Sequence, residues 1–158
     1  MNQQTMFNES IDVEKPEDEA TPVDRLVILP VKAVTISQPF ASLIADGSKF
    51  VENRTWECRY RGPIAIHAGK GTQYLDRREL QEYPNGGIVA VANLLACMPL
   101  ESMRRVSRDQ RIQRTELTIG KVLDHEHTEG PWCWILSEVK PCKFFPCRGA
   151  QGLWDFAG

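Results

Sequence analysis

The apolar segments of this chain are short, and glycine or proline lies beside nearly every one of them. Segments 31–36, 64–68, 88–95 and 132–139 are rich in β-branched, aliphatic or aromatic residues. Short apolar runs bounded by turn residues are typical of strands. The long amphipathic helices of a doubly wound α/β sheet are absent from the sequence. The pattern therefore predicts a mainly β (α+β) fold, a small barrel of four or five short strands with short helices between them.

Composition places the chain among ordinary globular proteins. It has 158 residues, of which 42% are hydrophobic and 25% charged, as in one soluble domain. It has no apolar run long enough for a membrane helix, and its first residues lack the pattern of a signal peptide. Five cysteines without a C-x-x-C pair suit a reducing compartment. We therefore expect a cytoplasmic protein with no membrane partner, no metal and no cofactor.

Charge is distributed unevenly along the chain. Residues 1–25 carry seven acids and two bases, which is a formal charge of −5, whereas the remainder carries +3. A proline-containing acidic segment with few aromatic residues cannot bury enough apolar area to offset its ordering entropy. We predict a disordered acidic tail over 1–25 and one domain over 26–158. The tail is either a solvated terminus or an acidic arm that competes with nucleic acid for the basic domain.

Two short helices are predicted in the first half of the domain. The first spans 39–46, because Phe40, Leu43 and Ile44 form one apolar face between a proline and Gly47. The second is a polar helix within 72–83. Residues 99–129 are polar, lack strand periodicity and are interpreted as an insertion or mobile segment. On a helix, three of their arginines would share one face: Arg104, Arg108 and Arg111.

Residues 49–56 are predicted to be extended, with an unusual set of side chains on one face. The twofold periodicity of a strand places Phe50, Glu52, Arg54 and Trp56 on the same side. A carboxylate, a guanidinium and an indole are uncommon together in a core. This face is therefore a candidate binding surface.

Several segments in order resemble the activating signal cointegrator homology (ASCH) domain. The G-x-K-x-x-E-x-R string from Gly47 to Arg54 is the most specific of them. The resemblance covers about 31–156 and is interrupted by 99–129, which does not fit the family pattern. The other matching segments are Ile36-Ser-Gln-Pro-Phe-Ala41, Tyr60-Arg-Gly-Pro63, Ile64-Ala-Ile-His67-Ala68 and Pro146-Cys-Arg-Gly149-Ala-Gln-Gly152-Leu-Trp154, the last similar to the closing strand of bacterial and phage-type members.

This resemblance implies a PUA-like β pseudobarrel with a cleft beside its first helix, and RNA or a nucleotide as the ligand. Cations suit phosphates, and flat aromatic or guanidinium groups suit bases. The candidate nucleic-acid-binding residues are Gln38, Lys49, Arg54, Trp56, Arg61, His67, Lys70, Arg148 and Trp154.

Enzymatic alternatives also follow from the resemblance. Some small members resemble amidohydrolases that act on N4-acetylcytidine, and others are proposed ribonucleases. In the first case, Lys49 matches the lysine proposed to act on the amide, with Glu52 and Arg54 as its catalytic neighbours. A lysine nucleophile must be neutral. The small hydrolases carry threonine where Glu52 stands, and a structural ion pair of Glu52 is an equally good interpretation.

Two questions stay open at the level of sequence. The chain could be an interaction module of a larger assembly, although no residue identifies a protein partner. His67 lies in an apolar strand, on the side of Ala65 rather than of Ile64 and Ile66. It is either a hydrogen-bonded wall residue or a base contact beside Lys70.

Overall fold

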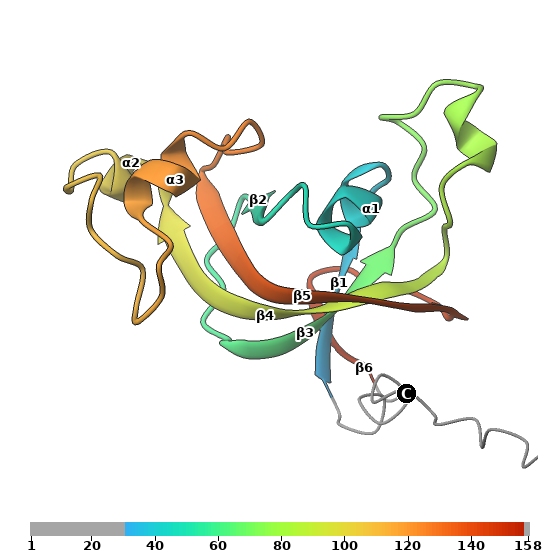
Figure 1. Ribbon diagram of the computed structural model, residues 1–158. Coiled ribbons are helices and arrows are strands. Elements are labelled where there is room, and N and C mark those ends of the chain that lie inside the picture. The colour runs from blue at the N-terminus through green and yellow to red at the C-terminus, as the bar shows by residue number, and fades with distance from the viewer. Residues whose placement is uncertain (1–30, 157–158) are drawn as a thin grey trace, which may run out of the picture.

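A single curved, six-stranded mixed sheet forms the molecule (Figure 1), and the computed structural model describes residues 31–156. The strand order is β2-β5-β4-β3-β1-β6, with β1 and β3 parallel and the other neighbours antiparallel. Within the described residues, the edge strands β2 and β6 do not pair, so the sheet curls without closing. The strands are β1 (Val31–Ile36), β2 (Val51–Arg54), β3 (Gly62–Ala68), β4 (Gly87–Pro99), β5 (Trp132–Pro146) and β6 (Leu153–Phe156).

Three short α-helices accompany the sheet within the described residues. They are α1 (Phe40–Ala45), α2 (Leu100–Met103) and α3 (Ile119–Leu123). The predicted mainly β pseudobarrel with short flanking helices is confirmed. The acidic tail predicted over 1–25 lies outside the described residues, and the assignment of one domain to 26–158 stays a prediction.

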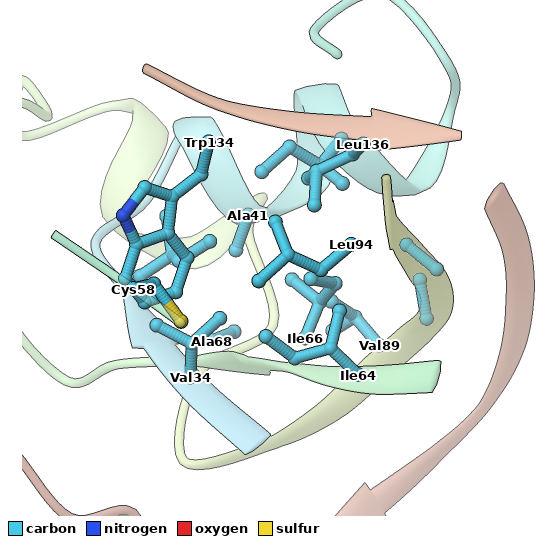
Figure 2. Close-up of a cluster of buried hydrophobic side chains, with 14 of the residues drawn as sticks. Val34, Ala41, Cys58, Ile64, Ile66, Ala68, Val89, Leu94, Trp134 and Leu136 are labelled. Carbon is cyan, nitrogen blue, oxygen red and sulfur yellow. The ribbon is translucent and has the colours of Figure 1, made fainter. Parts of the chain in front are cut away.

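The sheet buries apolar side chains on both faces because successive strand residues point to opposite sides. On β5, Trp134 and Leu136 belong to the inner cluster, whereas Cys133 and Ile135 belong to a second cluster on the other face. Figure 2 shows the Trp134 ring extending toward Cys58, and Leu136 lying across the same cluster from Ile64 and Ile66 of β3. A third, small cluster lies where β1, β3 and β6 meet.

Helix α1 covers the inner cluster through Ala41 and Ile44, both fully buried. Its start is held by Gln38, whose side-chain Oε1 accepts the Ser42 N–H at 3.0 Å and whose Nε2 donates to the Pro84 carbonyl at 2.6 Å. The predicted helix over 39–46 is confirmed.

Residues 99–129 cover the second cluster with Met103, Ile119 and Val122. The predicted arginine face is wrong, because α2 ends at Met103 and a series of turns follows. Each arginine instead forms an exposed ion pair with an acidic residue, so the three arginines do not share one helix face. The pairs are Arg104–Glu101 at 2.8 Å, Arg108–Asp124 at 2.6 Å and Arg111–Glu116 at 2.9 Å.

Two other elements differ from the sequence prediction. Within 72–83 only one 3-10 turn, Glu79–Gln81, forms. Leu80 within this turn and Tyr74 before it are exposed, and a short helix without a buried face is only marginally stable. Strand β5 continues past Pro141, where the apolar pattern ends. Beyond Ile135 it has no second partner strand, so a residue without an N–H is tolerated at this open edge.

Candidate nucleic-acid interface

The G-x-K-x-x-E-x-R motif folds into a buried cluster of three charged side chains. The Lys49 side chain, only 3% exposed, donates from Nζ to the Val51 carbonyl and to Glu52 Oε2, the latter at 2.9 Å. The other carboxylate oxygen of Glu52 lies 3.3 Å from Arg54 Nε. Glu52 thus bridges two cations, and a buried charge is stable in this way only when it is paired.

Arg54 also joins two strands that are not neighbours in the sheet. Its Nη2 donates to the Thr35 carbonyl of β1 at 2.8 Å, and its guanidinium lies 5.8 Å from the centre of the Trp134 ring. This contact connects β2 to β1 across the opening of the pseudobarrel.

Strand alternation explains most of this arrangement. Glu52 and Arg54 face one side of β2, as predicted, whereas Asn53 faces the other and holds the segment before β5. Asn53 Nδ2 donates to the His127 carbonyl at 2.7 Å. Phe50 departs from the prediction because β2 begins only at Val51, and its ring packs with the second apolar cluster.

A small pocket of about 260 Å³ lies beside α1, directly over the charged cluster. Its walls include Phe40 and Tyr74, whose ring centres are 5.1 Å apart, and His127. Lys49 Nζ lies 5.7 Å from the centre of the Phe40 ring. The pocket therefore combines aromatic surface with fixed hydrogen-bonding groups.

A larger pocket of about 960 Å³ adjoins the small one, since Thr35 and Arg54 line both. Its other charged residues are Lys70 and Arg148, and no carboxylate from residues 31–156 is part of its lining. The loop 147–152, which connects β5 to β6, forms one wall.

His67 supports that loop from beneath. The side chain is buried, and its Nε2 donates to the Cys147 carbonyl at 3.1 Å. The ring of Trp154 meets it edge-on, with centres 5.9 Å apart, in the third cluster. His67 faces this cluster, as the period of the strand predicts. It is thus a hydrogen-bonded wall residue, and it also lines the larger pocket.

Four predicted binding residues line neither pocket. Gln38 is buried and caps α1. Trp56 packs edge-on against buried Trp134 at 4.8 Å, and Arg61 donates to the Cys58 carbonyl at 2.7 Å. Trp154 is packed behind His67. Each of these side chains has a packing or hydrogen-bonding role in the fold, and the ligand contacts assigned to the four residues stay predictions.

Sequence reasoning missed several lining residues. Phe40 is predicted only as part of the apolar face of the helix, whereas its ring is partly exposed and lines the small pocket. Tyr74 lies in the segment that is wrongly predicted to be helical. Thr35 and His127 carry no sequence signal for this role. Only the strand pairing and the Asn53 contact bring them to the site.

Burial changes the ionisation of two groups near the site. It raises the pKa of the Cys147 thiol, with a smaller opposing effect of a backbone hydrogen bond. The sulfur that lines the larger pocket is thus a neutral thiol at pH 7. Burial also lowers the pKa of His125 from its usual 6.5, and the neighbouring His127 adds to this effect. His125 packs edge-on against Phe50 at 4.2 Å.

No helix within residues 31–156 is long and apolar enough to cross a membrane.

Comparisons with known proteins relate the chain to one family. The family model described as ASCH domain matches residues 34–144. No curated protein matches the sequence. Among solved structures, ASCH from Zymomonas mobilis is 19% identical, with a TM-score of 0.42 over 73% of this chain and 72% of that one. A single-substitution variant of that protein gives 19% identity and a TM-score of 0.43, over 73% and 74% of the two chains.

Proposed function

Because the chain belongs to the ASCH domain family, which is regarded as binding RNA or nucleotides, we propose that it binds single-stranded RNA or a nucleotide in the small pocket beside α1. The observation that carries this proposal is the composition of that pocket. Two aromatic rings, Phe40 and Tyr74, stand over a fixed cluster of acceptors and donors. Unstacked bases are recognised by aromatic stacking together with hydrogen bonds to their edges.

The donor and acceptor groups suit the edge of a base. A carboxylate has about four acceptor positions, and Glu52 uses one for Lys49 and directs another oxygen toward Arg54. The remaining positions can accept an exocyclic amine, while Arg54 can donate to a carbonyl. The volume of about 260 Å³ lies below the range of about 300–1,000 Å³ typical of drug-sized ligands and suits a single base.

Tyr74 supplies the sharpest test, because it is 57% exposed and its loss disturbs little of the core. Stacking of one base on an aromatic ring contributes about 1–3 kcal/mol. Tyr74→Ala should therefore weaken the binding of a short single-stranded RNA by about fivefold to 150-fold, measured by fluorescence anisotropy.

Val106→Ala is the matched control, since Val106 is an exposed apolar residue outside both pockets. Equal affinities of the Tyr74 variant, the control and the wild type would contradict the proposal. Absence of RNA binding by the wild type would contradict it as well.

The amidohydrolase alternative receives less support from the same pocket. A lysine that attacks an amide needs a free amine, whereas Lys49 donates to both Val51 and Glu52. Glu52 in turn contacts two cations and is not free to act as a base, which leaves Glu129 as the other carboxylate of the described pocket lining. Release of acetate from N4-acetylcytidine by the wild type, and its loss in Lys49→Ala, would favour the enzyme over the binding module. RNA cleavage in the binding assay would favour the ribonuclease.

A further inference from the structure

We infer that the larger pocket is a phosphate subsite, and that the preferred ligand is a nucleoside carrying a phosphate monoester. This inference rests on the proposed function and adds the class of ligand. The ligand would place its base in the small pocket and its phosphate in the larger one. Thr35 and Arg54 line both pockets, so a single molecule can occupy the two together.

Charge is the first argument. Arg54, Lys70 and Arg148 line the larger pocket, and among the residues that the structure describes no carboxylate does. Arg54 is already paired with Glu52. Within residues 31–156, neither Lys70 nor Arg148 forms an ion pair. A phosphate monoester carries about −1.5 to −2 charges at pH 7, which matches these two cations.

The backbone of the loop is the second argument. Gly149, Ala150 and Gln151 all line the pocket. In the part of the chain that the structure describes, no backbone carbonyl accepts their N–H groups. Backbone N–H groups that lack a protein acceptor are suitable donors to the oxygens of an anion. Lys70 and Arg148 would then supply the charge and the loop would supply directed hydrogen bonds.

Two glycines allow the close contacts that position Lys70 and Arg148 at the larger pocket. The stem of Lys70 lies against Gly86, where an added Cβ would meet Lys70 Cε at 2.9 Å. Gly149 lies flat on His67, where a Cβ would fall 2.5 Å from Cε1 of that ring. Arg148 directly precedes Gly149, so the close approach of Gly149 to His67 fixes the position of the Arg148 backbone.

The loop is also anchored at two carbonyls. Thr35 Oγ1 donates to Ala150 at 2.8 Å, and His67 donates to Cys147 at 3.1 Å. The Cys147 N–H in turn donates to the Gly86 carbonyl at 3.1 Å, which links the two glycine contacts. The pocket is therefore formed before any ligand arrives, and little ordering cost opposes binding.

Calorimetric titration of the full chain tests the inference with defined ligands. The four ribonucleosides are compared with their 5′-monophosphates, using the wild type, Lys70→Gln, Arg148→Gln and the control Arg105→Gln. Arg105 is exposed and lies outside both pockets. At least one monophosphate should bind ten times or more tighter than its nucleoside. Each pocket variant should remove most of that ratio, and the control should keep it.

Equal affinity for nucleoside and monophosphate would overturn the inference. So would a phosphate preference that persists in both pocket variants. A tetranucleotide with and without a 5′-phosphate distinguishes a phosphorylated RNA end from a free nucleotide as the source of the monoester.

A second measurement separates failure of this inference from failure of the proposed function. Inorganic phosphate is titrated while the amide resonances of Gly149 and Ala150 are followed by NMR, and saturable shifts lost in Arg148→Gln are expected. RNA binding that depends on Tyr74 without any phosphate preference would end the inference and leave the function standing. Phosphate shifts without binding of any nucleoside, nucleotide or RNA would end the proposed function, and the assigned ligand class with it.

Discussion

Glu52 is the residue on which the geometry of the small pocket depends. It contacts Lys49 on one side and Arg54 on the other, and both cations are largely removed from solvent. Removing one partner of a buried ion pair leaves an uncompensated charge and costs about 3–5 kcal/mol. The charged cluster therefore holds the pocket in shape as well as offering groups to a ligand.

Glu52→Gln should lower the free energy of unfolding by about 3–5 kcal/mol in urea denaturation, because Lys49 would keep only the Val51 carbonyl and a neutral amide. Glu101→Gln is the control, since its pair with Arg104 is exposed and contributes at most about 1 kcal/mol. If the two variants lose equal stability, the cluster does not have this structural role.

His125 makes stability depend on pH. Burial lowers its pKa in the folded chain, so the unfolded chain binds the proton more readily. Its contribution to stability is therefore present above about pH 6.5 and is lost as the pH falls below that value. In the neutral form, Nδ1 accepts the His127 N–H at 3.0 Å, and this contact is lost on protonation.

His125→Gln should thus show a smaller fall in unfolding free energy between pH 7 and pH 5 than the wild type does. Urea denaturation at the two pH values measures this difference. The same pH dependence in both proteins would show that His125 does not carry the effect.

At the scale of elements, strand periodicity predicted more than helix patterns did. The strand at 31–36 follows from its β-branched residues, and the common face of Glu52 and Arg54 follows from strand alternation. The helix expected over 72–83 does not form: Tyr74 packs against Phe40 from an irregular segment, and Leu80 stays exposed, so no continuous apolar helix face is buried. The resemblance predicted a cleft beside the first helix, where the small pocket lies. The larger pocket could not be predicted, since it requires Arg54, His67 and Arg148, from three distant segments, to come together in the folded sheet.

Gly149 sets the distance between the loop 147–152 and the sheet, because a side chain at this position would meet β1 and β3. In Gly149→Ala, the new Cβ would lie 2.5 Å from the His67 ring and 2.8 Å from Thr35 Oγ1, so the loop must move. Each charge-assisted hydrogen bond contributes about 1.5–3 kcal/mol, and the variant should bind nucleotides about tenfold to 100-fold more weakly.

Gly71→Ala is the matched control for this calorimetric comparison. The nearest atom to its new Cβ belongs to the flexible side chain of Gln73, which can turn away at little cost. Equal affinities of the two variants would show that the position of the loop does not matter.

For the molecule as a whole, local charge matters more than net charge. The formal net charge is −2, yet the described part of the chain places three cations and no acid in the lining of the larger pocket. For single strands, each phosphate contact contributes about −0.7 to the slope of log K against log salt concentration. If Lys70 and Arg148 both contact phosphates, RNA binding should show a slope of about −1.4, and a flat salt dependence would contradict phosphate contact.

The pairing of β1 with β6 has a practical consequence for rebuilding the molecule. Val31 is opposite Phe156 in this antiparallel ladder, so both ends of the described chain leave the sheet at the same place. Thr35, which lines both pockets, lies four residues further along β1, or about 13 Å away. A short peptide linker can therefore join these ends, and a circular permutant opened in another surface loop retains every strand pair and leaves the approach to the pockets unobstructed.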